Sequence, residues 1–127
     1  MLWASRKRLR ELEIIREEVA NRRDPRMPQD VEDLARRGVA VSKWYLKRFD
    51  RRGVDAFRRD LARILLVSEY YSAVVELLGD IKPAEQNPHA VGLERELALV
   101  KQTAIDRLSG STVHGYRYRE EEDWPEI

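Results

Sequence analysis

The sequence of 127 residues contains no cysteine and only two histidines, His89 and His114, which stand 25 positions apart. Without cysteine the chain can form no disulfide, no cysteine-ligated zinc site and no thiol nucleophile, and two distant histidines do not make a multi-histidine metal site. The motifs of phosphate-binding loops, of Gly-x-Ser-x-Gly nucleophile elbows and of His-Glu-x-x-His metal sites are also lacking. We therefore expect no enzymatic activity, no metal ion and no cofactor.

Long hydrophobic runs are absent as well. The longest aliphatic runs have four residues, at 64–67 and 97–100, whereas a membrane-spanning helix needs about 20. The first ten residues include four cations, but no apolar stretch with a small-residue cleavage site follows them. We expect a protein of the cytoplasm without membrane contact.

The net charge of +1 conceals two halves of opposite sign. Residues 1–63 hold 18 Lys and Arg against 11 Asp and Glu, whereas residues 64–127 hold 6 against 12. Most cations of the first half are arginines, whose planar fork of five donors fits phosphate oxygens. The sequence therefore predicts a polyanion partner for the first half and favours nucleic acid, although solvated charged helices give the same pattern.

Helical periodicity runs through most of the chain and predicts an all-α fold of four to five helices. A helix is expected over residues 5–23, with Ser5 as its N-cap and with one apolar face formed by Leu9, Leu12, Ile15 and Val19. A second helix is expected to begin at Asp30 and to be interrupted at Gly38. A third segment would run from Ser42, as its cap, to Gly53.

Two long central helices are expected to form an oligomerisation core. The first, over residues 55–78, has apolar side chains on two faces, which a second subunit or another helix of the same chain can cover. The second would start at Asn87 and Pro88 and end at Ser109–Gly110. The side chains predicted to face a neighbouring subunit are Leu61, Ile64, Leu65, Tyr71, Val75, Leu93, Leu97 and Val100.

The third segment is the best candidate for binding DNA, because Lys43, Lys47 and Arg51 are spaced by four and would form one basic row on a helix. Together with the turn expected at Gly38, residues 31–49 are similar to a helix-turn-helix, and a kinked helix pair is the alternative. The full predicted set of DNA-binding residues is Arg6, Lys7, Arg8, Arg10, Lys43, Lys47, Arg48, Arg51 and Arg52.

Residues 44–111 contain a set of spaced single residues and pairs, namely Trp44, Asp60–Leu61, Tyr70, Tyr71, Asn87–Pro88 and Arg107 to Ser111. In these residues the chain resembles the small terminase subunit of tailed bacteriophages, the component of the genome-packaging motor that recognises DNA. The loop over residues 79–86 is shorter than in some members of that family, and the Gly-Leu-Thr-Pro often found near the end of the last helix is absent.

The resemblance implies a helical protein that assembles into a ring, binds phage DNA through basic elements and recruits the large terminase subunit, which holds the ATPase and nuclease. On this interpretation the chain divides into a basic DNA-binding region (1–53), a helical oligomerisation core (54–110) and a flexible acidic and aromatic tail (111–127). Tyr116, Tyr118 and Trp124 of the tail would contact the large subunit.

Two other classes of protein stay open. A small helix-turn-helix transcriptional regulator predicts a dimer with one tight palindromic site. A purely structural helical protein, such as a virion connector or a subunit of a ribonucleoprotein, predicts assembly without affinity for free DNA.

Overall fold

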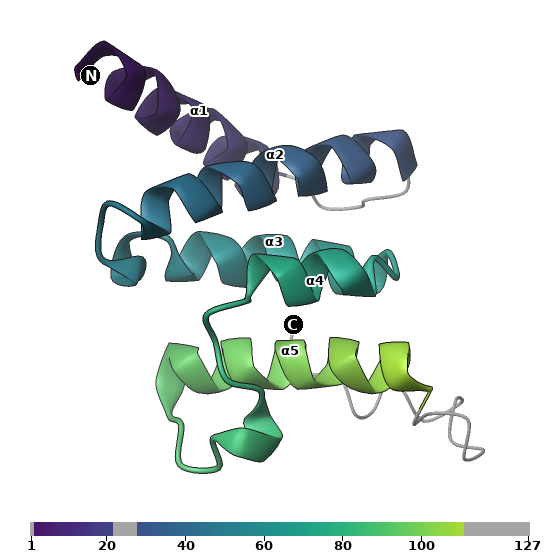
Figure 1. Cartoon of the computed structure of the whole chain (residues 1–127). Helices are drawn as coiled ribbons and strands as arrows, with labels where there is room; N and C mark the ends of the chain where they lie inside the picture. Colours follow the sequence, from purple (N-terminus) through teal and green to yellow (C-terminus); the bar gives the residue numbers. More distant parts are fainter. Residues whose placement is uncertain (1, 22–27, 111–127) are drawn as a thin grey trace.

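The computed structural model describes residues 2–21 and 28–110 and confirms the all-α prediction (Figure 1). Within these residues there are five α-helices, two short 3-10 helices and no strand. None of the helices in these two ranges is both long enough and apolar enough to cross a bilayer. The α-helices are α1 (Leu2–Asn21), α2 (Pro28–Leu46), α3 (Asp55–Val67), α4 (Tyr71–Leu77) and α5 (Gly92–Ser109), and the 3-10 helices are η1 (Arg51–Gly53) and η2 (Ala84–Gln86).

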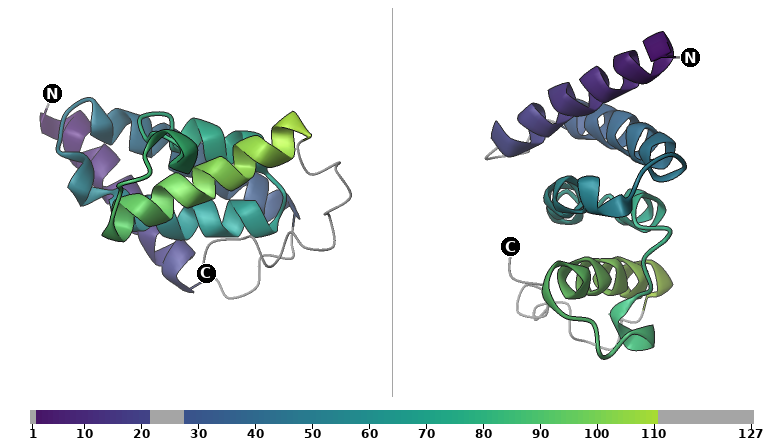
Figure 2. Two further views of the ribbon diagram at one scale, coloured as in Figure 1. Left: turned by 90° about the horizontal axis from the view of Figure 1, so that it is seen from below. Right: turned by 90° about the vertical axis from the view of Figure 1, so that its left-hand side faces the viewer.

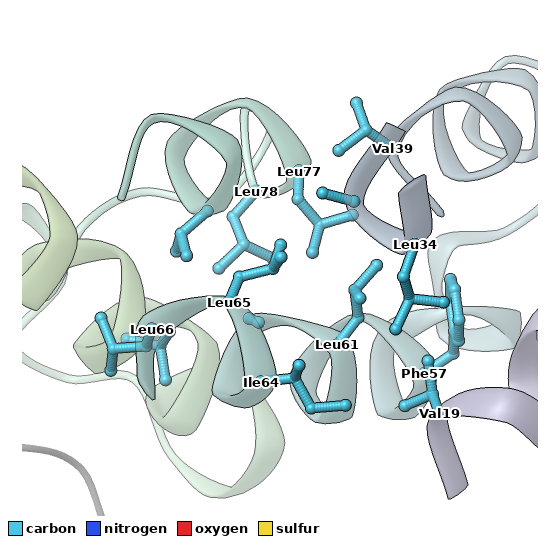
Figure 3. Packing of buried hydrophobic residues seen from close by; sticks show 14 of the residues in the cluster. Val19, Leu34, Val39, Phe57, Leu61, Ile64, Leu65, Leu66, Leu77 and Leu78 are labelled. Carbon is cyan, nitrogen blue, oxygen red and sulfur yellow. The ribbon is translucent and has the colours of Figure 1, made fainter. Parts of the chain in front are cut away.

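The helices are stacked in layers, with α1 and α2 at one side, α3 and α4 in the middle and α5 at the other side (Figure 2). Helix α3 is the centre of the fold, because it packs against each of the other four α-helices. A single cluster of buried apolar side chains runs from Leu12 in α1 to Ala104 in α5 (Figure 3). The regions 1–53 and 54–110 therefore share one hydrophobic core.

Helix α1 starts at Leu2, three residues before the predicted cap at Ser5. The prediction that Leu9 shares the buried face is wrong, because Leu9 is 38% exposed. The rest of the predicted face is confirmed, since Leu12, Ile15 and Val19 are at most 4% exposed. These three side chains all lie in the second half of the helix. The first half therefore carries little of the packing that holds α1 on the core.

Helix α2 is continuous, so the predicted interruption at Gly38 is wrong and no turn of a helix-turn-helix lies there. A Cβ added to Gly38 would lie 2.3 Å from Leu61 Cδ2, which shows that the glycine lets α2 approach α3 closely. The predicted cap at Ser42 is also wrong, because Ser42 is buried inside the helix. The chain leaves the helix after Leu46, well before Gly53.

The predicted helix over residues 55–78 is two helices, because the backbone turns at Ser68–Tyr70. Glu69 has a left-handed backbone with φ of 64°. The amide of Glu69 donates to Leu66 O (3.1 Å) and that of Tyr70 to Leu65 O (2.8 Å), the bond pattern of a Schellman motif, which commonly uses glycine at the left-handed position. The turn folds α4 back against α3 and exposes a groove between α2 and α4.

Helix α5 begins at Gly92, so the predicted start at Asn87–Pro88 is wrong. The side-chain amide of Asn87 donates to Glu94 Oε2 (3.1 Å) within that helix. The predicted end is confirmed, since the helix stops at Ser109 and Gly110 follows with φ of 75° in the left-handed region.

Candidate nucleic-acid interface

The first half of α1 is a basic helix surface. Between Leu2 and Arg10 it carries Arg6, Lys7, Arg8 and Arg10 and no acidic residue. All four cations are exposed. With 100° between successive residues, Arg6 and Arg10 lie on the side of the helix opposite to Leu12 and Ile15, the side chains that α1 buries. This surface, formed by Trp3, Arg6, Lys7 and Arg10, is called the α1 basic face below.

Most of the cations of the α1 basic face are available for an external anion. Within the described residues, Arg6 and Arg10 have no acidic partner, and Lys7 Nζ lies 5.6 Å from the centroid of the Trp3 ring. The Trp3 side chain itself is 74% exposed, an unusual position for so large an aromatic ring. Arg8 lies on the other side of the helix and donates to Glu11 at 3.2 Å on the surface, where such a pair contributes little.

The side chains of this face surround a shallow open hollow, whose lining comes entirely from α1 and consists of Trp3, Arg6, Lys7, Leu9, Arg10 and Glu13. Leu9 is 38% exposed at its edge. The hollow therefore offers apolar surface next to three positive charges. Such a combination suits a polyanion that also has flat or apolar parts.

A second basic group lies on the segment between α2 and α3. Lys47, Arg48 and Arg52 are exposed there, together with Phe49, whose side chain is 44% exposed. The guanidinium of Arg48 lies 5.1 Å from the centroid of the Trp44 ring. This segment is called the α2–α3 loop below.

Asp50 shapes the α2–α3 loop by accepting hydrogen bonds from Arg52. Its carboxylate caps η1 through the Arg52 amide (2.9 Å) and pairs with the guanidinium at 2.8 Å. The side-chain and backbone hydrogen bonds from Arg52 lower the pKa of Asp50 below its ordinary value. Arg52 is thus partly neutralised, whereas Lys47 and Arg48 have no ion pair within the described residues.

The α2–α3 loop lies at the same end of the molecule as the first half of α1 (Figures 1 and 2). The guanidinium of Arg16 in α1 donates to the carbonyl oxygen of Gly53 in η1 and so holds the loop against the helix. The structure thereby brings the amino-terminal cations and the loop cations to one end, although they come from different helices.

The predicted basic row of Lys43, Lys47 and Arg51 does not exist as a row on one helix. Lys43 lies in the last turn of α2, Lys47 lies after the helix and Arg51 opens η1. Lys43 pairs with Glu76 of α4 at 2.7 Å. Arg51 pairs with Glu94 of α5 and lies 3.5 Å from Asp55. Two of the three cations are therefore engaged within the fold.

Most of the predicted subunit-interface residues are covered by other parts of the same chain. The fully buried ones, from 0 to 9% exposed, are Leu61, Ile64, Leu65, Leu97 and Val100. The two apolar faces of α3 are thus explained by packing within one chain, and an interface between copies would have to use other residues. Tyr71, Val75 and Leu93 are half-buried, and the hydroxyl of Tyr71 accepts a hydrogen bond from Arg107 at 2.8 Å.

The predicted partner-binding residues Tyr116, Tyr118 and Trp124 lie outside the described residues.

Trp3 and Phe49 are exposed aromatic residues of the candidate site that were not among the predicted site residues. The spacing of Trp3 with Arg6 and Lys7, three and four positions on, would have placed it on the same helix face as those cations. No local pattern indicates that Phe49 is exposed.

Comparison with known proteins gives no relative. No protein-family model matches the chain, and neither a curated protein nor a solved structure matches it significantly.

Proposed function

We propose that this protein binds double-stranded DNA through the α1 basic face, without enzymatic activity of its own. The observation that supports this most directly is the set of exposed cations Arg6, Lys7 and Arg10, which point away from the core and have no carboxylate within bonding distance in the described structure. Cations left unpaired on a protruding helix neutralise DNA phosphates and release their counterions.

The shape of α1 fits this role. Its first half packs little against the rest of the fold, so a nucleic acid can approach it from several sides. An α-helix with its side chains is about 10–12 Å wide, which matches the width of about 12 Å of the DNA major groove. Lys47 and Arg48 of the α2–α3 loop, at the same end of the molecule, would contact a neighbouring phosphate.

The role in genome packaging is a narrower proposal and rests on the resemblance of residues 44–111 to small terminase subunits. It adds a ring of many copies and recruitment of the large terminase subunit through the tail. Because the apolar faces of α3 and α5 are occupied within one chain, a ring would be held together by surface residues. A mass measurement in solution tests this proposal, since a closed ring and a monomer differ many-fold in mass.

The two remaining classes make different predictions for DNA. A helix-turn-helix regulator acting through residues 31–49 is not supported, because α2 is continuous there. A purely structural helical protein would not bind free DNA. Affinity for DNA at low salt therefore separates that class from the proposed function.

The decisive experiment reverses the charges of the α1 basic face. The variant R6E/K7E/R10E should lose DNA binding in a fluorescence anisotropy titration, because it replaces phosphate attraction by repulsion. The dependence of the wild-type affinity on salt should also be steeper than that of the neutral variant R6Q/K7Q/R10Q by about three in the log–log slope. Neither variant touches a buried side chain, so both should fold.

A matched control reverses two cations far from α1. Lys82 and Arg95 are exposed and have no ion pair within the described residues. The variant K82E/R95E should bind DNA almost as well as the wild type. Equal losses in the two charge-reversal variants would mean that only the net charge matters, and unchanged binding in R6E/K7E/R10E would contradict the proposal.

A further inference from the structure

The sequence of the tail is the electrostatic complement of the α1 basic face. Residues 2–10 carry four cations and no acid, whereas residues 120–127 carry five acids and no cation. Both segments also contain a tryptophan, Trp3 in the first and Trp124 in the second. Trp3 is highly exposed, and the hollow beside it has apolar surface at Leu9.

The two segments start from opposite ends of the molecule. The first half of α1 and the end of α5 lie at different ends of the molecule in Figure 1 and in the left view of Figure 2, and they lie in different layers in Figure 1 and in the right view of Figure 2. To reach α1 of its own chain, the tail must return along α5, whose 18 residues measure about 27 Å, and then cross the layers of α3 and α2. Glu120 lies ten residues after Gly110, so the chain between them spans at most about 36 Å. The acidic stretch therefore reaches the α1 basic face of its own chain only when the tail is almost fully extended, which costs conformational entropy, whereas the tail of a second copy can approach the face from any side.

We propose that the acidic stretch of residues 120–127 binds the α1 basic face of a second copy of this chain. Carboxylates of the stretch pair with Arg6, Lys7 and Arg10, and Trp124 packs into the hollow between Trp3 and Leu9. The α1 basic face of each copy then holds the tail of the next. Such a head-to-tail contact uses two different surfaces, so it propagates from copy to copy and closes into a ring or extends as a chain.

Charge sets the strength of this contact. Exposed ion pairs are individually weak and are screened by salt, so the assembly is favoured by low ionic strength and by high protein concentration. Because phosphates would occupy the same cations, DNA would compete with the tail; this consequence rests on the proposed function. The contact between copies itself does not depend on nucleic acid.

The test is a charge swap in the full-length protein, followed by sedimentation velocity at low ionic strength without nucleic acid. One variant reverses the face (R6E/K7E/R10E) and the other reverses the tail (E120K/E121K/E122K/D123K). We expect the wild type to sediment as species larger than a monomer. Each variant alone should lose at least about tenfold in association constant, because attraction becomes repulsion.

Mixing the two variants is the sharpest part of the experiment. The unchanged basic face of the tail variant can bind the unchanged acidic tail of the face variant, and the two reversed segments attract each other. The equimolar mixture should therefore assemble again, which general damage to either variant cannot produce. K82E/R95E should assemble as the wild type does.

Three results would overturn the proposal: a wild type that stays monomeric at every concentration, assembly that neither reversal weakens, or a mixture that fails to recover assembly. Circular dichroism of each variant should show unchanged helix content. Since these measurements contain no DNA, failure of the contact between copies and failure of DNA binding are recognised separately.

Discussion

Arg58 in α3 and Asp80 in the segment after α4 form an ion pair in which the arginine side chain is completely buried. Arg58 Nη2 also donates to Asp55 Oδ1 at 2.7 Å, and Nη1 donates to the carbonyl oxygen of Leu77 at 3.2 Å. The guanidinium thus ties the first turn of α3 to the end of α4 and to the segment beyond it. These contacts hold α4 in its folded-back position against α3.

Removal of the buried cation should strongly destabilise the fold. In Arg58→Met the apolar part of the side chain is kept, but Asp55, whose side chain is 8% exposed, loses its hydrogen bond from Arg58 and keeps only the longer contact with Arg51 at 3.5 Å. We expect the free energy of unfolding in urea to fall by about 3 kcal/mol, the lower end of the range for broken buried pairs, because Asp80 can regain water. Arg36→Met is the matched control, since the pair of Arg36 with Asp33 is largely exposed. Equal losses in both variants would contradict the role of Arg58.

Asp80 should make the stability depend on pH in the acid range. Burial alone would raise the pKa of its carboxyl, but the hydrogen bond and the charge of Arg58 outweigh it, so the pKa lies below its ordinary value. The stabilising contribution is complete above the unfolded pKa of about 3.9 and disappears as the pH falls through the lower pKa of the folded state.

The measurement is the free energy of unfolding of the wild type and of Asp80→Asn over a series of pH values. At neutral pH the wild type should be the more stable, and the difference between the two proteins should shrink as the pH falls below about 4. Asp50, whose pKa is also lowered, is present in both proteins and cancels in the comparison. A difference that stays constant down to the most acid condition would contradict this assignment.

The sequence predicted the helical class, the buried face of α1 and the end of α5, because these depend on local patterns. Leu12, Ile15 and Val19 recur at helical spacing, and Gly110 takes the left-handed backbone for which glycine is suited. Apolar side chains on two faces of α3 correctly indicated burial on both sides. Periodicity cannot show whether the elements that bury these two faces belong to the same chain or to another subunit. In this structure α2 and α5 of the same chain bury them.

The candidate site was predictable only in part, since ion pairs join residues that are distant in the sequence. Arg6, Lys7 and Arg10 were found because local charge alone marks them. Lys43 and Arg51 are not available to bind DNA, because they pair with Glu76 and Glu94, which lie 33 and 43 positions further on in the sequence. No local rule identifies such partners.

Gly38 shows a second limit of prediction from sequence, because the reason for a glycine inside a helix lies in the neighbouring helix. Glycine inside a helix usually weakens it by about 1 kcal/mol, which is why an interruption was expected. Here its missing Cβ leaves room for Leu61 Cδ2, at 2.3 Å from where that atom would be. Gly38→Ala should therefore lower the free energy of unfolding by about 1–3 kcal/mol despite the better helix propensity of alanine.

Gly79→Ala is the control for this substitution. Gly79 is exposed, its φ is not positive, and the nearest atom to an added Cβ is the carbonyl oxygen of Glu76 at 3.5 Å, an ordinary contact. Its unfolding midpoint in urea should stay unchanged or rise slightly. If Gly38→Ala were as stable as Gly79→Ala, α2 and α3 could not be in such close contact.

The predicted long helix of residues 55–78 breaks at Glu69, and a glycine at this position should make the protein more stable. With φ of 64° it occupies the left-handed position of the Schellman motif, which costs a residue with a side chain about 1 kcal/mol. Glu69→Gly should raise the free energy of unfolding by up to this amount, as measured by urea denaturation. Glu69→Ala removes the same charge but keeps the Cβ, so it should give no such gain. A long uninterrupted helix in solution would instead make Glu69→Gly destabilising, because the glycine would then lie in a helix interior.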